Sequence, residues 1–339
     1  MKTDLQKASQ ATYADMYAQT VSENEESDNE LSVEETRNDE TDTMEELLHA
    51  YDRDTRELEL IHSKVTSIQA LGLDHFTNIK TLGLRQNFIA EIEALPPTLA
   101  DLDLYDNRIK HISGLDHVNL ENLDLSFNKI KHIRHLNHMT ELTNLYFVQN
   151  KIGKIENLEG LPKLRNLELG ANRIREMENL DSLTGLEELW LGKNKISRLQ
   201  GVSSLVRLQI LSLQSNRLTE ISGLENLKSL REFYVSHNAI TKITGLEANT
   251  QLRVLDISAN PIYDLQHLSS LALLEELWAS SCKISSFAQV EQELKPLEHL
   301  TTVYFEHNPL QTSNQATYRN KVRFAIPQIK QIDATFVRI

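Results

Sequence analysis

Asparagine recurs along this chain at almost constant intervals, and each one follows an apolar residue five positions earlier. From residue 128 onward the interval is 22 residues, and the full series is Asn87, Asn107, Asn128, Asn150, Asn172, Asn194, Asn216, Asn238 and Asn260. A fixed interval of this length indicates one repeated supersecondary unit, because each copy must place its apolar residues in the same register. The chain is therefore predicted to fold as a stack of equivalent coils.

Apolar residues take four fixed positions in each coil. Around Asn107 they are Leu102 and Leu104 on one side and Ile109 and Ile112 on the other. Two core residues separated by one position predict a short strand, so the residue four before the asparagine points away from the core. The pattern is typical of leucine-rich repeats, whose turn asparagine bonds backbone groups that the bend leaves unpaired. We call the asparagine position the ladder position.

The register predicts an α/β fold, a leucine-rich-repeat solenoid of about twelve 22-residue coils with a parallel concave sheet. Cys282 takes the ladder position 22 residues after Asn260, and Asn308 follows after 26. The additional residues are expected to form a helical connection around Phe287, Val290, Leu294 and Leu297. The expected parts are an acidic disordered tail at 1–42, a capping helix at 43–57, the solenoid at 58–308 and a C-terminal cap at 309–339.

A solenoid exposes apolar core at both ends unless something covers it, and both ends of this chain carry a candidate. Thr43 and Glu46 have the spacing of a capping box, and an apolar face with helical spacing follows at Met44, Leu47, Leu48 and Tyr51. Beyond Asn308 the chain departs from the repeat. The residues expected to cover the last coil are Tyr318, Val322, Phe324, Ile326 and Ile329.

The net charge of −14 belongs mostly to the first 50 residues, whose 14 acidic and 3 basic residues give −11 and leave −3 for the rest. In this tail Ser22, Ser27 and Ser32 precede acidic residues, as in sites of acidophilic kinases, so phosphorylation is an open alternative to an unmodified tail. A single cysteine, no long apolar stretch and no signal segment predict an intracellular protein. We expect no nucleic acid and no membrane as partners, because no cluster of Lys and Arg is evident.

The outward position four residues before the ladder position holds acidic and aromatic side chains and no basic one. From coil to coil it contains Glu59, Gly83, Asp103, Asp124, Tyr146, Glu168, Trp190, Ser212, Tyr234, Asp256, Trp278 and Tyr304. Five aromatic residues, including both tryptophans, exceed what strand preference predicts. The outward position two before the ladder is small or polar from Gly170 to Ser280, so the aromatic side chains are expected to be accessible. Such a face is typical of a binding surface for a partner protein that supplies Lys or Arg.

Two other groups of residues raise the question of a metal site or an active site. The first group consists of five histidines: His111, His117, His132, His135 and His138. The coil interval relates four of these residues in pairs, so we expect them to form solvated columns on successive coils. Cys282 lies in a ladder position, where a structural thiol is expected. No phosphate loop, nucleophile elbow or zinc-protease motif is present. We therefore expect no metal, no cofactor and no enzymatic activity.

Several segments resemble the leucine-rich regulatory subunits of protein phosphatase 1 over about residues 50–339. They are Leu102-Asp-Leu-Tyr-Asp-Asn-Arg-Ile109, Leu167-Glu-Leu-Gly-Ala-Asn-Arg-Ile-Arg175, Leu191-Gly-Lys-Asn-Lys-Ile196 and Gln331-Ile-Asp-Ala-Thr-Phe-Val-Arg338. The resemblance implies that the concave face binds the catalytic subunit of this Ser/Thr phosphatase. It places the contacts at Asp124, Tyr146, Glu168, Trp190, Glu276, Trp278 and Tyr304, to which the register adds Tyr234.

The same resemblance implies a phosphatase inhibitor protein as a further partner, roles in phosphatase assembly and mitotic chromosome segregation, and a location in the nucleus and the cytoplasm. The alternative is a generic leucine-rich scaffold for an unrelated intracellular protein. Residues Lys321-Val-Arg-Phe324 match the short motif by which other subunits dock on this phosphatase. That docking needs an exposed extended strand, and we expect Val322 and Phe324 to serve as core cover instead.

Overall fold

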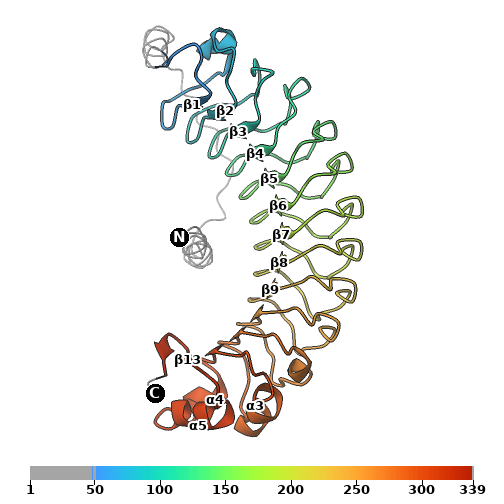
Figure 1. The fold of residues 1–339 in the computed structure, drawn as a ribbon, viewed down its shortest axis with the longest axis vertical. Coiled ribbons are helices and arrows are strands. Elements are labelled where there is room, and N and C mark those ends of the chain that lie inside the picture. Colours follow the sequence, from blue (N-terminus) through green and yellow to red (C-terminus); the bar gives the residue numbers. More distant parts are fainter. Residues whose placement is uncertain (1–47, 49–50, 338–339) are drawn as a thin grey trace, which may run out of the picture. The chain divides into compact units, whose positions relative to one another are not determined.

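The computed structural model describes Leu48 and residues 51–337, and these residues form one continuous series of stacked coils (Figure 1). Each coil contributes one strand to the inner side of the curve. Twelve parallel strands follow one another in chain order: β1 (Glu57–Glu59), β2 (Thr81–Gly83), β3 (Asp101–Asp103), β4 (Asn122–Asp124), β5 (Asn144–Tyr146), β6 (Asn166–Glu168), β7 (Glu188–Trp190), β8 (Ile210–Ser212), β9 (Glu232–Tyr234), β10 (Val254–Asp256), β11 (Glu276–Trp278) and β12 (Thr302–Tyr304). The predicted solenoid with a parallel concave sheet is confirmed.

The sheet ends in a short hairpin that the repeat does not predict. β13 (Gln331–Ile332) pairs in parallel with β12, and β14 (Thr335–Phe336) returns antiparallel to β13. Every strand from β1 to β12 pairs with its neighbour without a shift, as in Leu123 opposite Leu145. Equivalent residues of successive coils therefore lie side by side along the whole sheet.

Helices are few among the described residues, because a coil of this length leaves little chain for the outer side. The short 3-10 helices are η1 (Gln69–Leu71), η2 (Leu73–His75) and η3 (Leu268–Ser270), and the α-helices are α3 (Phe287–Leu294), α4 (Pro309–Thr312) and α5 (Tyr318–Ala325). The predicted helical connection around Phe287 is confirmed as α3, whose first turn is capped by the Ser286 hydroxyl, which accepts from the Gln289 N–H at 3.2 Å. None of the helices in the described ranges has the length and apolar character that crossing a membrane requires.

The four apolar positions of each coil form one continuous core. In the coil of Asn172 the corresponding side chains are Leu167, Leu169, Ile174 and Met177, each at most 1% exposed. A buried side chain of this size contributes roughly 1.5–3 kcal/mol relative to an exposed one. The core therefore runs the length of the stack, and each coil depends on its neighbours for burial.

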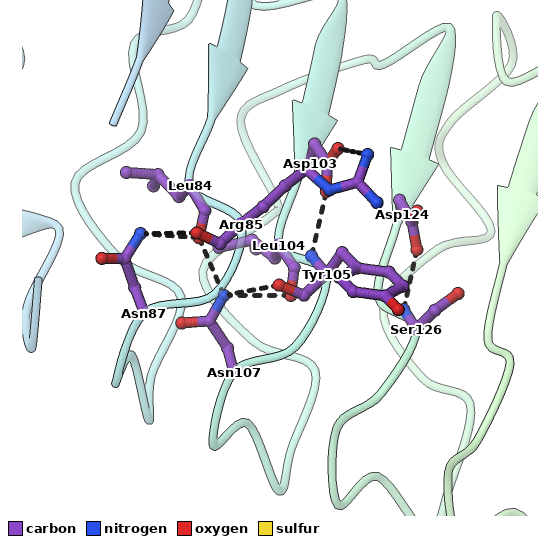
Figure 2. Close-up of polar contacts among 9 residues, drawn as sticks. All are labelled: Leu84, Arg85, Asn87, Asp103, Leu104, Tyr105, Asn107, Asp124 and Ser126. Carbon is purple, nitrogen blue, oxygen red and sulfur yellow. Dashed lines mark hydrogen bonds and ion pairs between the residues drawn. The ribbon is translucent and has the colours of Figure 1, made fainter. Parts of the chain in front are cut away.

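The ladder asparagines connect adjacent coils through their side-chain amides. The Asn107 Oδ1 accepts from the Ile89 N–H at 3.0 Å, and its Nδ2 donates to Leu84 O at 2.9 Å and to Leu104 O at 3.1 Å. Figure 2 shows this amide beside Asn87, which also donates to Leu84 O. The ladder asparagines are buried, except for the half-buried Asn216 and Asn238, and each satisfies backbone groups of two coils at once.

Cys282 occupies the same position in its coil and serves the same structural purpose. Its buried thiol donates to Ile257 O at 3.4 Å. Burial raises the pKa of the Cys282 thiol to about 11, so it stays protonated at neutral pH. A protonated, buried thiol is a poor nucleophile, which agrees with the structural role predicted for it.

The C-terminal cap confirms part of the prediction and corrects one residue. Tyr318, Val322, Ile326 and Ile329 are buried, but Phe324 is 82% exposed. Residues 318–325 are helical, so side chains four and seven positions after Tyr318 face the core, and Phe324 lies on the opposite side. The prediction that Phe324 covers the last coil is wrong, and residues 321–324 are helical and not the extended strand that docking by this motif needs.

At the N-terminal end most of the predicted tail and capping helix, including Thr43, Glu46 and Met44, lies outside the described residues. Leu48 and Tyr51 are described and pack against the core of the first coil. The Tyr51 hydroxyl also donates to Glu59 O at 2.9 Å. These two contacts are consistent with a cover at this end.

Candidate functional site

The predicted partner-binding residues all lie on the sheet that forms the inner side of the curve. Seven of them are the last residue of their strands, and the eighth, Glu276, begins β11. The seven are Asp124, Tyr146, Glu168, Trp190, Tyr234, Trp278 and Tyr304. Because the strands pair in register, these side chains form one column across the sheet, which we call the concave column. Their role in binding a partner stays a prediction.

Four of the five aromatic residues of the concave column, all but Tyr146, contact one another in a continuous series. Trp190 and Tyr234 stack with ring centroids 6.2 Å apart, Tyr234 lies 6.1 Å from Trp278, and Trp278 meets Tyr304 edge-on at 5.9 Å. Each such pair adds about 0.5–1.5 kcal/mol beyond its burial. The rings are thus held in place before any partner arrives.

Two small or short side chains make this series possible. Ser212 lies between Trp190 and Tyr234 on the intervening strand and is 2% exposed, while Asp256 lies between Tyr234 and Trp278 and is 5% exposed. The rings lean over them and meet. The aromatic side chains are half-buried by one another, so part of each ring stays accessible.

For three of the rings, a carboxylate two residues earlier in the chain fixes the polar end of the ring. The contacts join Trp190 Nε1 to Glu188 Oε2 at 3.2 Å, the Tyr234 hydroxyl to Glu232 Oε2 at 2.7 Å, and Trp278 Nε1 to Glu276 Oε2 at 3.0 Å. Sequence reasoning missed Glu188 and Glu232. The signal was present as a triplet of glutamate, core residue and aromatic residue that returns every second coil.

The first and the last aromatic residue of the column have different polar partners. The Tyr146 hydroxyl accepts from Asn166 Nδ2 at 3.5 Å, and the Tyr304 hydroxyl accepts from Gln331 Nε2 at 2.8 Å. Gln331 belongs to the C-terminal hairpin, so the cap extends the site beyond the repeats. A partner on this face would meet the cap as well as the coils.

Four carboxylates on this face are poorly solvated. Burial, with repulsion from Asp124 and Glu188, raises the pKa of Glu168 to about 7, and a hydrogen bond with Asn166 opposes the shift. Burial also raises the pKa of Asp124, of Glu188 and of Asp256. Removing a carboxylate from water is unfavourable unless a cation compensates it. A partner that brings Lys or Arg to this face would supply the missing compensation.

At the N-terminal end of the sheet such compensation is already present (Figure 2). Arg85 Nη1 lies 3.5 Å from Asp103 Oδ2, and its guanidinium lies 4.4 Å from the centre of the Tyr105 ring. Asp124, on the next strand, instead accepts from the backbone N–H of Ser126 at 2.8 Å. Within the described residues, the acidic residues of the predicted contact set therefore lack the ion pair that Asp103 has.

The histidines show no arrangement for a metal. His132 Nδ1 lies 3.0 Å from Glu156 Oε1, and the Nε2 atoms of His117 and His138 contact backbone carbonyls. No group of three or more His, Cys, Asp or Glu with metal-ligand geometry occurs in the part of the chain that the structure describes. All five histidines are solvent-exposed.

One premise of the sequence analysis is corrected. Basic residues do cluster, because the residue after the ladder position is basic in six successive coils, at Arg108, Lys129, Lys151, Arg173, Lys195 and Arg217. They lie 21 or 22 residues apart in sequence and come together only through stacking of the coils. A scan for runs of Lys and Arg does not detect such a column.

The repeat, the sheet and the amide ladder define a leucine-rich-repeat protein. A family model described as Leucine Rich repeats (2 copies) matches residues 140–182, 184–226, 206–248 and 228–271. Among solved structures, an internalin of Listeria monocytogenes covers 87% of this chain and 89% of its own with a TM-score of 0.65 at 24% identity. A Leptospira interrogans leucine-rich-repeat protein gives a TM-score of 0.62 at 22% identity, covering 79% of this chain and 75% of its own. At these identities the likeness concerns the fold alone.

The sequence is similar to regulatory subunits of protein phosphatase 1, as the resemblance of its segments predicts. Subunit SDS22 of Schizosaccharomyces pombe is 57% identical over 58 residues, 17% of this chain and 18% of the relative. Subunit SDS22 of Saccharomyces cerevisiae is 46% identical over 133 residues, 38% and 33% of the two chains. Human regulatory subunit 7 is 59% identical over 46 residues, 14% and 12%. The matches thus span a third or less of each of these relatives, whose names describe regulators and not enzymes, in agreement with the expected absence of catalysis.

Proposed function

We propose that this protein is a non-catalytic regulatory and targeting subunit that binds the catalytic subunit of protein phosphatase 1 through the concave column. The observation that carries the proposal is the series of contacting rings from Trp190 to Tyr304, on the same face as Glu168 and Glu188, whose pKa values burial raises. Pre-positioned aromatic rings lose little conformational freedom on binding, and they are enriched among residues that dominate binding energy. The curated relatives carry the name of this phosphatase.

The size of the column supports a folded protein as the partner. From Asp124 on β4 to Tyr304 on β12 the column crosses nine strands, or about 40 Å of sheet. A small molecule would occupy one or two strands. The carboxylates on this face would interact favourably with Lys or Arg side chains of the partner, and the electrostatic attraction would accelerate association at low salt.

The proposal extends to the cellular role that the resemblance implies. We assign the chain to phosphatase assembly, with a phosphatase inhibitor protein as a third component, to a nuclear and cytoplasmic location, and to mitotic chromosome segregation. Fractionation and imaging of the tagged chain through the cell cycle test these assignments. A chain that never enters the nucleus would contradict them without affecting the proposed contact surface.

The test of partner identity is affinity capture from native extract, followed by mass spectrometry. The full chain is compared with a variant that carries Trp190→Ala and Trp278→Ala. The catalytic subunit of protein phosphatase 1 is expected with the wild type and not with the variant. The alternative, a generic leucine-rich scaffold, predicts an unrelated protein and no phosphatase in the wild-type sample. Undiminished phosphatase with a correctly folded variant would show that another surface binds it.

A further inference from the structure

A second charged surface lies beside the carboxyl ends of the strands. It consists of the residue directly after the ladder position in six successive coils, and we call it the basic ridge: Arg108, Lys129, Lys151, Arg173, Lys195 and Arg217. The flanking coils carry Phe88 before it and Ala239 after it at the same position. Six equivalent positions of the same sign in a chain with a net charge of −14 call for an explanation.

The backbone of the ridge is regular. Each ridge residue donates its N–H to the carbonyl of the preceding coil, as in Lys151 N to Ile130 O and Arg173 N to Ile152 O, both at 2.8 Å. Equivalent atoms of successive coils are therefore spaced like neighbouring strands, about 4.8 Å apart. Five such steps place the six cations along about 24 Å. The ridge is a line of cations with a fixed spacing, and not a random surface group.

The ridge cations have no carboxylate partner of their own. Within the described ranges, none of the six forms an ion pair, whereas on the opposite edge of the sheet Arg165 pairs with Glu187 at 2.7 Å and Arg253 pairs with Glu275 at 2.6 Å. Arg108, at one end, lies 4.2 Å from the centre of the Phe88 ring. Arginines at the amino ends of the strands thus form ion pairs with glutamates, whereas the ridge cations at the carboxyl ends form none among the described residues.

Further basic residues and a surface depression lie next to the ridge. The position two residues after each ridge residue is basic or neutral throughout, at Lys110, Lys131, Gly153, Arg175, Ser197 and Thr219. A shallow open depression of about 310 Å³ lies beside the ridge and is lined by Arg175, Glu176, Ser197, Arg198 and Gln200. Two guanidinium groups and a hydroxyl in one hollow can bind a carboxylate or a phosphate through charge-assisted hydrogen bonds. Glu176 would limit that site to anions that reach the two arginines.

We propose that the basic ridge binds an extended acidic segment of a partner protein, rich in Asp and Glu. One column of cations suits one extended chain, and about seven residues at 3.3 Å per residue cover its length. Single-stranded nucleic acid is a poorer match, because its binding sites stack bases on aromatic side chains. From Lys151 to Arg217 neither the ridge nor the position two residues after it carries an aromatic residue. The ridge is separate from the concave column, so this inference does not rest on the proposed function.

The test uses the full chain and a fluorescein-labelled peptide of about ten alternating Asp, Glu and Ser residues, titrated by fluorescence anisotropy at low salt. The ridge variant carries Lys129→Glu, Lys151→Glu and Arg173→Glu. The matched control carries Lys80→Glu, Lys228→Glu and Arg231→Glu, three exposed cations away from the ridge that give the same change in net charge. All six are solvent-facing or half-exposed, so both variants are expected to fold, which circular dichroism verifies.

The ridge variant is expected to bind the peptide at least about tenfold more weakly, and the control within about twofold of the wild type. Binding should weaken steeply with added salt, and Trp190→Ala with Trp278→Ala should leave it unchanged. An equal loss of peptide affinity in the ridge variant and the control would overturn the proposal, because it would show that the peptide responds only to the net charge of the protein. Tighter binding of a single-stranded oligonucleotide of equal charge, or no measurable peptide binding, would also overturn it.

Discussion

Trp190 and Tyr234 lie on β7 and β9, with a whole strand between them, yet their rings stack at 6.2 Å and 20°. The contact depends on Ser212, which occupies the equivalent position of β8 and is 2% exposed beneath the rings. A larger residue there would hold the rings apart. The binding surface therefore depends on the alternation of aromatic residues with smaller residues along the column, and not only on the aromatic residues.

Ser212→Leu tests this dependence. The added volume has no room under the stacked rings, so we expect a loss of about 1–3 kcal/mol in the free energy of unfolding and a changed near-ultraviolet dichroism from Trp190. Thr219→Leu, at an exposed position, is the control and should change neither. A Ser212→Leu chain with unchanged stability and tryptophan signal would show that the rings do not need a small residue between them.

Glu168 predicts a dependence on pH. Its pKa of about 7 in the folded chain lies above its ordinary 4.5, so the folded state favours the protonated form. Its contribution to stability is fully present below about pH 4.5 and is lost as the pH rises through about 7. We expect Glu168→Gln to stabilise the chain by on the order of 2 kcal/mol at about pH 8 and by little at about pH 5, measured by thermal unfolding.

The same group links pH to binding. A cationic partner needs Glu168 ionised, so affinity should rise from about pH 6 to about pH 8 in the wild type and be flatter in Glu168→Gln. A wild-type affinity that falls over this interval, with both proteins stable, would contradict an acidic contact at this position.

Asn172→Ala tests the amide ladder. The Asn172 Oδ1 accepts from Ile152 N–H at 2.9 Å, and its Nδ2 donates to Phe147 O at 2.8 Å and Leu169 O at 3.1 Å. Removing the amide leaves the buried Ile152 N–H without a partner, whereas Phe147 O and Leu169 O keep bonds from Asn150 and Asn194, so urea unfolding should show a loss of about 1–3 kcal/mol. Asn119→Ala, at an exposed position, should cost less than about 1 kcal/mol. Similar effects of the two changes would mean that the ladder contributes little.

The C-terminal cap offers a matched pair within one helix. Val322 is fully buried and Phe324 is 82% exposed. Val322→Ala should destabilise the chain by about 2 kcal/mol, whereas Phe324→Ser should change stability by no more than about 0.5 kcal/mol. A larger loss from Phe324→Ser, measured by the same chemical denaturation, would mean that the ring packs against the solenoid in solution.

The repeat register predicted most of the architecture because each coil position has one physical environment. Counting from Asn107 or Asn172 alone assigns core, ladder and concave residues correctly. The register could not predict contacts between coils that are two steps apart, such as Trp190 with Tyr234, since these depend on the size of the residue between them. It also could not place Phe324, because the cap leaves the repeat and follows helical periodicity instead.

Two parts of the surface were missed for a simpler reason. Glu188 and Glu232 lie six residues before the ladder position, outside the two outward positions that the register singles out, although the Glu-x-aromatic triplets are visible in the sequence. The basic ridge was missed because Lys129 and Lys151 are distant in sequence and adjacent only in the stack. In a solenoid, charge clusters must be sought along coil positions and not along the chain.

The central claim is that the concave column binds the catalytic subunit of protein phosphatase 1, and calorimetric titration of the two purified proteins tests it most directly. The wild type is compared with Trp190→Ala/Trp278→Ala and with a control, Phe88→Ala/Tyr263→Ala, which removes two exposed rings outside the column. We predict tight binding by the wild type and the control, and at least about a hundredfold loss in the tryptophan variant. Equal affinity of all three folded proteins, or no binding by the wild type, would contradict the claim.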